Sequence, residues 1–412
     1  LIKTFKTRIR PTKEQVTYLN KCFGYRRFVY NNTLEYFNKI LEFNGNIVDK
    51  DLRKFFDKFD FITHIYSKKE KEPGFEWTGE YNKSIKNETV SDVNLAVNKF
   101  FKDIKNKQRC KLHFKRKIHG NGSFRIYIKQ AAVKILDKNK FSFIINREYG
   151  HMELKTYEDI SFLYHHEMKT MSISMENFKY YVSFTYEIDN PSHNHEKNTI
   201  GIDLGIHNPV VCFDGKDIIN PKFPKGKIKK LEKKTDKLSE IVSKKKYDKR
   251  NPSKNYIKAR TKLNDIHAKI VNIRMDYIQK VSTFLAKTYR NVVVDEFSFK
   301  DLLTESDGIK RINRGIHRVG AFTFTQVLKY KCRFYGSEYI LAEPNSTITC
   351  SVCNHKVKTK MKLSQRVFNC PQCGHIDDRD NNAAINIYNT FKLSLLTNVN
   401  KDFAVGRTVQ RT

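Results

Sequence analysis

Residues 345–386 read NSTITCSVCNHKVKTKMKLSQRVFNCPQCGHIDDRDNNAAIN, and the interpretation of the whole chain starts from this stretch. Cys350 and Cys353 form one C-x2-C pair, Cys370 and Cys373 form a second, and sixteen residues separate the pairs. Each pair can occupy a tight turn, so that four thiolates close tetrahedrally on one zinc ion. The loop between the pairs is too polar to fold on a core of its own, and the metal would supply that core. The spacing therefore predicts a structural zinc ribbon.

A disulfide-bonded loop is the alternative for these cysteines. We disfavour it because the sequence shows no secretory signal. In addition, the other four cysteines are scattered singly, at Cys22, Cys110, Cys212 and Cys332.

An acidic cluster follows the ribbon directly. Asp377, Asp378 and Asp380 surround an arginine, and residues 381–386 (NNAAIN) read as the beginning of a helix. A carboxylate at a helix N-terminus is favoured by the helix dipole and is well placed to bind a cation. Helix capping explains one or two of these acids, but not their position directly after a ribbon. We therefore expect partner carboxylates elsewhere in the chain.

The first partner is expected at the end of the apolar run 199–205 (TIGIDLG). In a strand, its three large apolar residues would face one side, and Gly201, Asp203 and Gly205 would face the other. The glycines would leave bare backbone beside Asp203, which we interpret as room for a metal ion and a phosphate.

The second partner is expected in the run 292–299 (VVVDEFSF), which ends in the adjacent acids Asp295 and Glu296. Neighbouring strand residues face opposite ways, so only one of these two acids can face Asp203. Three carboxylates on two strands and a helix suit phosphodiester cleavage by two Mg²⁺ ions about 3.5–4 Å apart. Hard oxygen ligands are those that Mg²⁺ prefers.

The order of these motifs resembles a known family. Gly-Ile-Asp-Leu-Gly, then Val-Val-Val-Asp-Glu, then the paired cysteines followed by Asp-Arg-Asp-x-Asn-Ala-Ala is similar to the split RuvC nuclease of the transposon-encoded TnpB proteins. These are small relatives of type V CRISPR effectors. The resemblance extends to residues 2–6 (IKTFK) and 22–31 (CFGYRRFVYN), and it is weakest over residues 40–110.

The resemblance implies an RNA-guided DNA endonuclease whose first catalytic acid is Asp203 and whose third is Asp380. The middle position departs from the family, which usually has glutamate as the first acid after the apolar run, where this chain has Asp295. Asp295 would serve from a slightly shifted strand, or Glu296 would serve through a local bulge. In the third alternative the site is weakened and the protein only binds DNA.

The net charge of the 412-residue chain is +34 and its pI is near 9.7, which predicts a polyanionic partner. No run of about 20 apolar residues could span a membrane, and no basic amphipathic anchor is evident, so we expect no membrane partner. Bases interleaved with aromatic residues make Arg26, Arg27, Lys115 and Arg125 candidates for nucleic-acid contacts. We expect a cytoplasmic protein that acts on the nucleoid.

The expected fold is α+β and bilobed. A helical lobe and a β-barrel wedge precede an RNase H-like (RuvC) α/β domain with an inserted zinc ribbon. Antiparallel strands are predicted at 111–117, 123–130, 132–137, 140–145, 171–177 and 179–188. Residues 224–290 predict two long helices broken at Asn251–Pro252, with a lysine-rich tip, and Asp301–Arg318 is expected to be a mobile loop. Residues 189–195 read as a polar linker whose His193 and His195 are solvated rather than metal-binding.

The predicted segments are a first wedge strand (1–16), a helical recognition lobe (17–110), the wedge (111–190), a linker (191–198), the nuclease with its helical hairpin (199–344), the zinc ribbon (345–376), the last nuclease segment (377–396) and a flexible tail (397–412).

The sequence leads to one interpretation and three alternatives. The interpretation is an RNA-guided DNA endonuclease that cuts next to a short flanking motif, with structural Zn²⁺, catalytic Mg²⁺, a guide RNA derived from a transposon end and target DNA as its partners. The alternatives are a nuclease-silent RNA-guided DNA-binding repressor, a transposase and a plain zinc-ribbon DNA-binding protein. The sequence shows no separate helix-turn-helix that would recognise transposon ends.

Overall fold

The computed structural model describes residues 1–45, 56–67, 71–108, 110–117, 120–128, 132–146, 148–189, 194–245, 252–295, 315, 318–342, 347–357, 361 and 365–404. The chain divides into two compact units, Leu1–Asp189 and Asn190–Thr412. The division falls at the start of the polar, proline-containing stretch 189–195.

Two antiparallel sheets form the β part of the first unit. The larger has the order β1-β7-β6-β2, from β1 (Ile2–Arg8), β7 (Lys179–Glu187), β6 (Met168–Glu176) and β2 (Asn121–Tyr127). The smaller has the order β3-β4-β5, from β3 (Val133–Asp137), β4 (Lys140–Asn146) and β5 (Gly150–Lys155). β5 was not predicted. β1 pairs with β7, with Ile2 opposite Glu187 and Arg8 opposite Tyr181.

The predicted strand at 111–117 is wrong. None of these described residues is in a strand, and the segment instead lies beside helix α1 (Lys13–Gly45). The side-chain amide of Asn31 donates to the carbonyl of Lys115 at 3.0 Å and accepts from its N–H at 2.7 Å. The Lys115 ammonium lies 5.0 Å from the ring centre of Tyr30. The backbone groups that a neighbouring strand would need are thus bound by a helix side chain.

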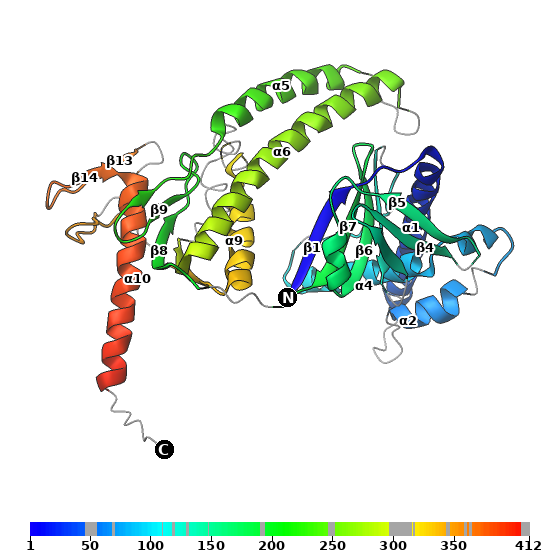
Figure 1. The fold of residues 1–412 in the computed structure, drawn as a ribbon, viewed down its shortest axis with the longest axis horizontal. Coiled ribbons are helices and arrows are strands. Elements are labelled where there is room, and N and C mark those ends of the chain that lie inside the picture. The colour runs from blue at the N-terminus through cyan, green and yellow to red at the C-terminus, as the bar shows by residue number, and fades with distance from the viewer. Residues whose placement is uncertain are drawn as a thin grey trace. The chain divides into compact units, whose positions relative to one another are not determined.

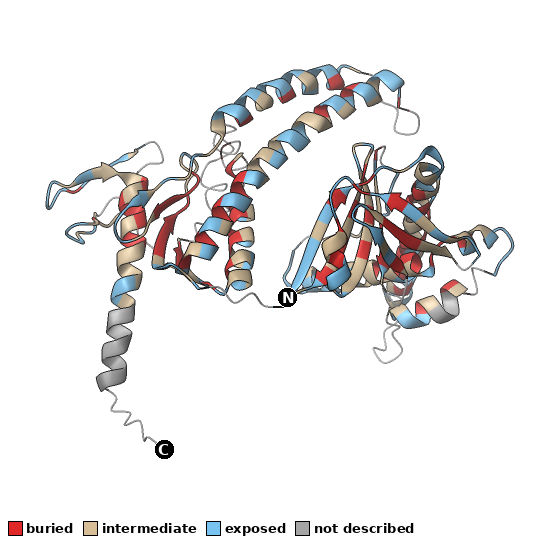
Figure 2. Ribbon diagram, in the orientation of Figure 1, coloured by how far each residue is buried: buried red, intermediate tan, exposed pale blue. Residues whose placement is uncertain are grey.

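Helices pack on these sheets around one shared core. α1 and α4 (Lys83–Lys105) are the long helices, and short pieces lie at α2 (Lys58–Asp60), η2 (Phe61–Tyr66), η3 (Glu76–Glu80) and η4 (Ser161–His165). Phe23 of α1 lies 5.7 Å from Phe124, which lies 6.4 Å from Phe143, between ring centres. The buried residues therefore run from α1 through both sheets (Figure 2). The helical part and the β part form one compact unit.

The start of helix α1 lies within the predicted first segment, 1–16. β1 ends at Arg8 and the helix begins at Lys13. Thr12 and Gln15 form a reciprocal cap: the Thr12 N–H donates to Gln15 Oε1 at 2.9 Å, and the Gln15 N–H donates to Thr12 Oγ1 at 3.3 Å. This capping box satisfies two backbone donors and fixes the start of the helix.

A five-stranded mixed sheet organises the second unit. Its order is β10-β9-β8-β11-β12, from β10 (Ile218–Ile219), β9 (Val211–Phe213), β8 (Lys197–Asp203), β11 (Tyr289–Val294) and β12 (Glu338–Leu341). β11 is parallel to both β8 and β12, and the other pairs are antiparallel. The alternation predicted for β8 is confirmed, because Ile200 and Ile202 pack with α6 (Lys254–Thr288) and α9 (Ala321–Tyr335). α10 (Arg379–Ala404) contacts β8 and β9 (Figure 1).

The two long helices predicted between residues 224 and 290 are present. α5 (Lys225–Ser243) and α6 lie side by side (Figure 1). The hydroxyl of Ser253 caps α6 by accepting from the Tyr256 N–H at 3.2 Å. Most of the predicted lysine-rich tip lies outside the described residues.

Helix α10 continues to Ala404, into the segment 397–412 that was expected to be a flexible tail. Residues 397–404 contain neither proline nor glycine, and the first glycine after them is Gly406, so no helix breaker acts before that point. Among the described residues, no helix is both long enough and apolar enough to cross a bilayer.

Candidate functional site

Asp203 and Asp295 lie at the same edge of the mixed sheet. β8 and β11 run parallel with Ile202 opposite Val294, and the Asp295 N–H donates to the Ile202 carbonyl at 3.2 Å. Both acids therefore come from the carboxyl ends of neighbouring parallel strands. This edge is where open α/β sheets bind their ligands.

Asp380 reaches this edge from the first turn of α10. Its N–H donates to Asp378 Oδ1 at 2.8 Å, so Asp378 caps the helix and Asp380 lies within it. A Cβ atom at Gly205 would lie 3.7 Å from Asp380 Oδ2. This contact places Asp380 on the side of β8 that carries Asp203.

The space beside Gly201 is not open, which corrects our interpretation of the glycines around Asp203. A Cβ atom there would lie 2.7 Å from both the Ala384 carbonyl oxygen and the Tyr388 nitrogen. The missing side chain at Gly201 thus allows the backbone of α10 to pack directly on β8. Gly201 therefore lets α10, which carries Asp380, lie close to β8, and it does not leave room for a ligand.

The three carboxylates act on one another electrostatically. Burial raises the pKa of Asp203 well above its usual range, and the charges of Asp380 and Asp295 raise it further. Arg379 and Arg366 oppose this rise only in part. Ionised carboxylates crowded in a buried position are stabilised by a cation, so the donor set fits a hard divalent metal.

The carboxylate of Asp380 accepts hydrogen bonds from two side chains. Its side chain is 6% exposed, Arg366 Nη2 donates to its Oδ2 atom, and Asn208 Nδ2 donates to the same atom at 3.4 Å. The described residues contain one group of three or more ligand atoms that all lie within 4.8 Å of one another, and that group is the cysteines. This group does not include the three aspartates.

Two of the expected site features cannot be placed. Glu296 lies outside the described residues, and so does the segment 301–318 except for Gly315 and Arg318. Arg318 forms a bidentate ion pair with Glu232 of α5, with Nη2 2.6 Å from Oε2. His193 is also outside the described residues, whereas His195 is within hydrogen-bonding distance of Ser337 Oγ at 3.0 Å.

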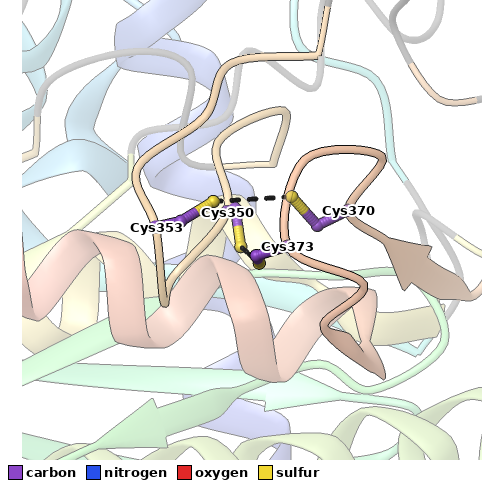
Figure 3. A group of neighbouring side chains, drawn as sticks. All are labelled: Cys350, Cys353, Cys370 and Cys373. Carbon is purple, nitrogen blue, oxygen red and sulfur yellow. Dashed lines mark hydrogen bonds between the residues drawn. The ribbon is translucent and has the colours of Figure 1, made fainter.

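The four cysteines meet as their spacing predicts (Figure 3). The Sγ atoms of Cys350 and Cys373 are 3.7 Å apart and those of Cys353 and Cys370 are 3.5 Å apart. Four sulfurs at Zn–S distances of about 2.3 Å in a tetrahedron lie about 3.8 Å from one another, so the cluster fits zinc. These distances are too long for disulfide bonds, which require about 2.05 Å.

Two matching turns hold the sulfurs. The N–H of Cys350 donates to the His355 carbonyl, and that of Cys370 donates to the His375 carbonyl, both at 2.9 Å. The residue after the second cysteine of each turn, Asn354 or Gly374, has a positive φ, and its N–H donates to the carbonyl of the first cysteine at 3.0 Å. Within the part of the ribbon that the structure describes, Phe368 is the one fully buried apolar residue beside Cys350 and Cys370. A core this small supports the expectation that a metal completes it.

The candidate nucleic-acid residues fall into two groups. Arg26 and Arg125 both pair with Asp92 of α4, at 2.9 and 2.5 Å, and Arg125 also pairs with Glu88 at 2.7 Å. These two arginines therefore connect α1, α4 and β2. Arg27 and Lys115 line a hollow of about 350 Å³ and pair with no carboxylate among the described residues.

Sequence reasoning missed three residues around the ribbon. Arg366 precedes β13 (Val367–Asn369), which pairs with β14 (Ile376–Asp378), and no motif marked it. Asn382 and Asn386 were noted only as part of a helix start. Both lie in the half-apolar hexapeptide NNAAIN and both are buried, and a buried amide needs specific partners.

Three family models match separate parts of the chain. A model described as "Helix-turn-helix domain" matches residues 1–45, one described as "Probable transposase" matches 183–305, and one described as "Cas12f1-like, TNB domain" matches 322–387. Over residues 1–45 the structure has one strand and one uninterrupted helix.

Relatives of known sequence carry names from the same group. A candidate RNA-guided DNA endonuclease of Streptomyces pristinaespiralis is 32% identical over 46% of this chain, which spans only 44% of that relative. The TnpB-like protein L770 of Acanthamoeba polyphaga mimivirus is 24% identical over 94% of the chain and 72% of its own length. InsQ of Escherichia coli K12, also a candidate RNA-guided DNA endonuclease, is 24% identical over 94% of the chain and 91% of its own length.

Among solved structures, a Cas12f1–sgRNA–target DNA complex aligns with 94% of this chain and 99% of its own at 18% identity and a TM-score of 0.34. The family models and the named relatives define a group of transposon-associated proteins. Within that group, the resemblance of this chain to the TnpB family is confirmed.

Proposed function

We propose that this chain is an RNA-guided DNA endonuclease that cuts DNA with Asp203, Asp295 and Asp380. The observation that carries the proposal is the gathering of these acids, remote in sequence, at one sheet edge, where burial and the other two carboxylates raise the pKa of Asp203. The five-stranded mixed sheet supports the expected RNase H-like architecture. The names of the relatives support the activity.

The residues present fit divalent metal at this edge. Asp203 and Asp380 are buried side chains with only oxygen donors, and Asp295 follows the neighbouring strand. Bound Mg²⁺ would supply the acidity that activates a water molecule and stabilises the leaving oxygen. The protein's own contribution is to hold three carboxyl groups at this edge, where burial and the other two carboxylates disfavour the ionisation of Asp203 until a cation compensates the charge.

We propose that the four cysteines bind a structural zinc ion. Their sulfurs come from two matching turns of the ribbon, and the ribbon lies directly before α10, which carries Asp380. The ribbon would thereby fix where α10 begins.

Guide RNA and target DNA are the proposed partners, and an origin of the guide at a transposon end belongs to the same proposal. The net charge of +34 requires a polyanion, and the hollow beside α1 gives one place for phosphate. It is lined by the cations Arg26, Arg27, Lys115 and Arg116. Burial lowers the pKa of Arg27, and a phosphate would offset that loss of hydration.

We predict that Arg27→Ala weakens RNA binding by about three- to tenfold and lowers the slope of log affinity against log salt by about 1. The cause is the loss of one phosphate contact. Fluorescence anisotropy with the copurified RNA over a KCl series measures both quantities. Lys21→Ala on the same helix is the matched control, because Lys21 is exposed and does not line the hollow. An unchanged slope for Arg27→Ala would exclude this contact.

The proposed activity is tested by plasmid-library cleavage. The chain is coexpressed with its flanking genomic RNA, and the complex is incubated with Mg²⁺ or with EDTA. We expect cutting only with Mg²⁺, at sites that share a short flanking motif. The absence of cutting from an RNA-loaded, DNA-binding complex would overturn the proposal.

A nuclease-silent DNA-binding repressor is the second candidate. Two observations favour it: the middle acid is the shorter Asp295, and Asp380 is already paired with Arg366. Specific binding without cutting in the same assay would establish this candidate. Strand joining, in place of cutting alone, would instead identify a transposase.

A further inference from the structure

Asn382 joins the first cysteine turn to α10. Its side chain is fully buried, its Oδ1 accepts from the Ser351 N–H at 2.9 Å, and its Nδ2 donates to the Thr349 carbonyl at 2.8 Å. One turn later, Asn386 Nδ2 donates to the same carbonyl at 2.6 Å. Three hydrogen bonds from two buried amides thus converge on one short stretch of backbone.

That backbone belongs to the metal-binding turn. Thr349 and Ser351 flank Cys350, whose sulfur is one of the four in the cluster. Any movement of this turn therefore moves the bonding partners of Asn382. Because a buried amide that loses its partners is costly, the turn and the helix will tend to move together.

The same helix turn presents Asp380. Asn382 follows Asp380 by two residues, within a stretch whose backbone is fixed by helical hydrogen bonds. On the other side, the Arg379 N–H donates to the Arg366 carbonyl at 2.8 Å, and the Arg366 side chain pairs with Asp380. The ribbon thus forms hydrogen bonds with the start of α10 on two sides.

We infer that Asn382 and Asn386 are positioning residues that couple the cysteine site to the carboxylate of Asp380. Order in the first cysteine turn would set the position of Asp380 and hence the affinity of the acidic site for divalent metal. The inference rests on the proposed function, because it takes Asp380 to be a metal ligand. Coupling of this kind is reciprocal, so metal at the acids would also raise the affinity of the cysteines for zinc.

The test measures metal binding, not cleavage. Mn²⁺ binding to the full chain is followed by electron paramagnetic resonance, with zinc content and thermal melting recorded on the same samples. Asn382→Ala is expected to bind Mn²⁺ about tenfold more weakly at full zinc content, and to bind zinc more weakly in equilibrium competition with a chelator. Asn386→Ala removes one bond and should show the same changes at about two- to fivefold.

Asn389→Ala is the matched control, because Asn389 lies on the same helix, is only half-buried and has no recorded partner among the described residues. It should bind Mn²⁺ as the wild type does. A purely structural role for Asn382 would lower the melting temperature of Asn382→Ala without changing the Mn²⁺ affinity of the folded protein. That result overturns the inference.

Two further variants separate this inference from the function on which it rests. Asp203→Asn and Asp380→Asn should each weaken Mn²⁺ binding, and unchanged binding in both would refute the acidic site itself. If Asn382→Ala does not fold, Asn386→Ala decides: weaker Mn²⁺ binding at full zinc content supports the coupling, and unchanged binding overturns it.

Discussion

Asp203→Asn is expected to lower DNA cleavage by at least about 10³-fold, as the loss of a charged group that acts in the transition state does. In EDTA, the same substitution is expected to stabilise the protein at neutral pH. Asparagine keeps the shape of aspartate, so both effects would come from the lost charge. Plasmid cleavage by the RNA-loaded complex and thermal melting of the metal-free protein measure them.

The direction of the stability effect follows from the raised pKa of Asp203. Burial first, then Asp380 and Asp295, make the folded protein hold the proton more tightly than the unfolded chain does. The stability that this carboxyl contributes is therefore complete below its unfolded pKa of about 3.9 and is lost as the pH rises through the folded pKa. Asparagine has no charge to bury. Its advantage, on the order of 1 kcal/mol or about 2–4 °C, should grow between pH 5 and pH 8.

Asp214→Asn is the matched control, because the surroundings of Asp214 lower its pKa whereas those of Asp203 raise its pKa. Burial works against ionisation of Asp214, but the N–H groups of Asp217 and Lys216 and the ammonium of Lys197 outweigh it and lower the pKa to about 2. Removing this charge should destabilise the protein at neutral pH. If Asp203→Asn melts below the wild type in EDTA at pH 8, or cleaves as well as the wild type, the acids are not arranged as we propose.

Local patterns were sufficient to predict the parts of the site that depend on spacing. The cysteine pairs required only two turns and one metal. The position of Asp203 followed from the alternation along β8, because one face of that strand is apolar. Gly320 and Gly336 both have positive φ and bound α9.

Contacts between distant segments could not be predicted in this way. β1 pairs with β7, about 180 residues later, and nothing within residues 2–8 specifies that register. The segment 111–117 has the composition of a strand, but Asn31 binds its backbone. Arg366 carries no motif, and its importance arises only because β13 begins beside the start of α10. In each of these cases a contact with a segment distant in sequence determined the local structure.

Cys370→Ser is expected to reduce bound zinc from one ion per chain to almost none after dialysis. Serine is a poor zinc ligand, and three remaining sulfurs leave a tetrahedral site open. The binding free energy of a structural zinc ion is about 10–16 kcal/mol in small zinc domains, and it stabilises their folded state. The ribbon should therefore unfold when the site no longer binds zinc. Zinc is measured by metal analysis, and ribbon order by hydrogen exchange of residues 347–378.

The loss of ordered structure in Cys370→Ser should be confined to the ribbon and the start of α10. The apolar core of the mixed sheet, with Ile202, Val294 and Leu328, does not include the cysteine cluster, so the sheet should keep its exchange protection. Cys110→Ser is the matched control, because Cys110 is a single, half-buried cysteine whose Sγ bonds only to the Phe100 carbonyl at 3.5 Å. It should retain one zinc ion. Full zinc content in Cys370→Ser would show that Cys370 is not a ligand, whereas zinc-free wild-type protein with an ordered ribbon would show that the sulfurs need no metal to hold the start of α10.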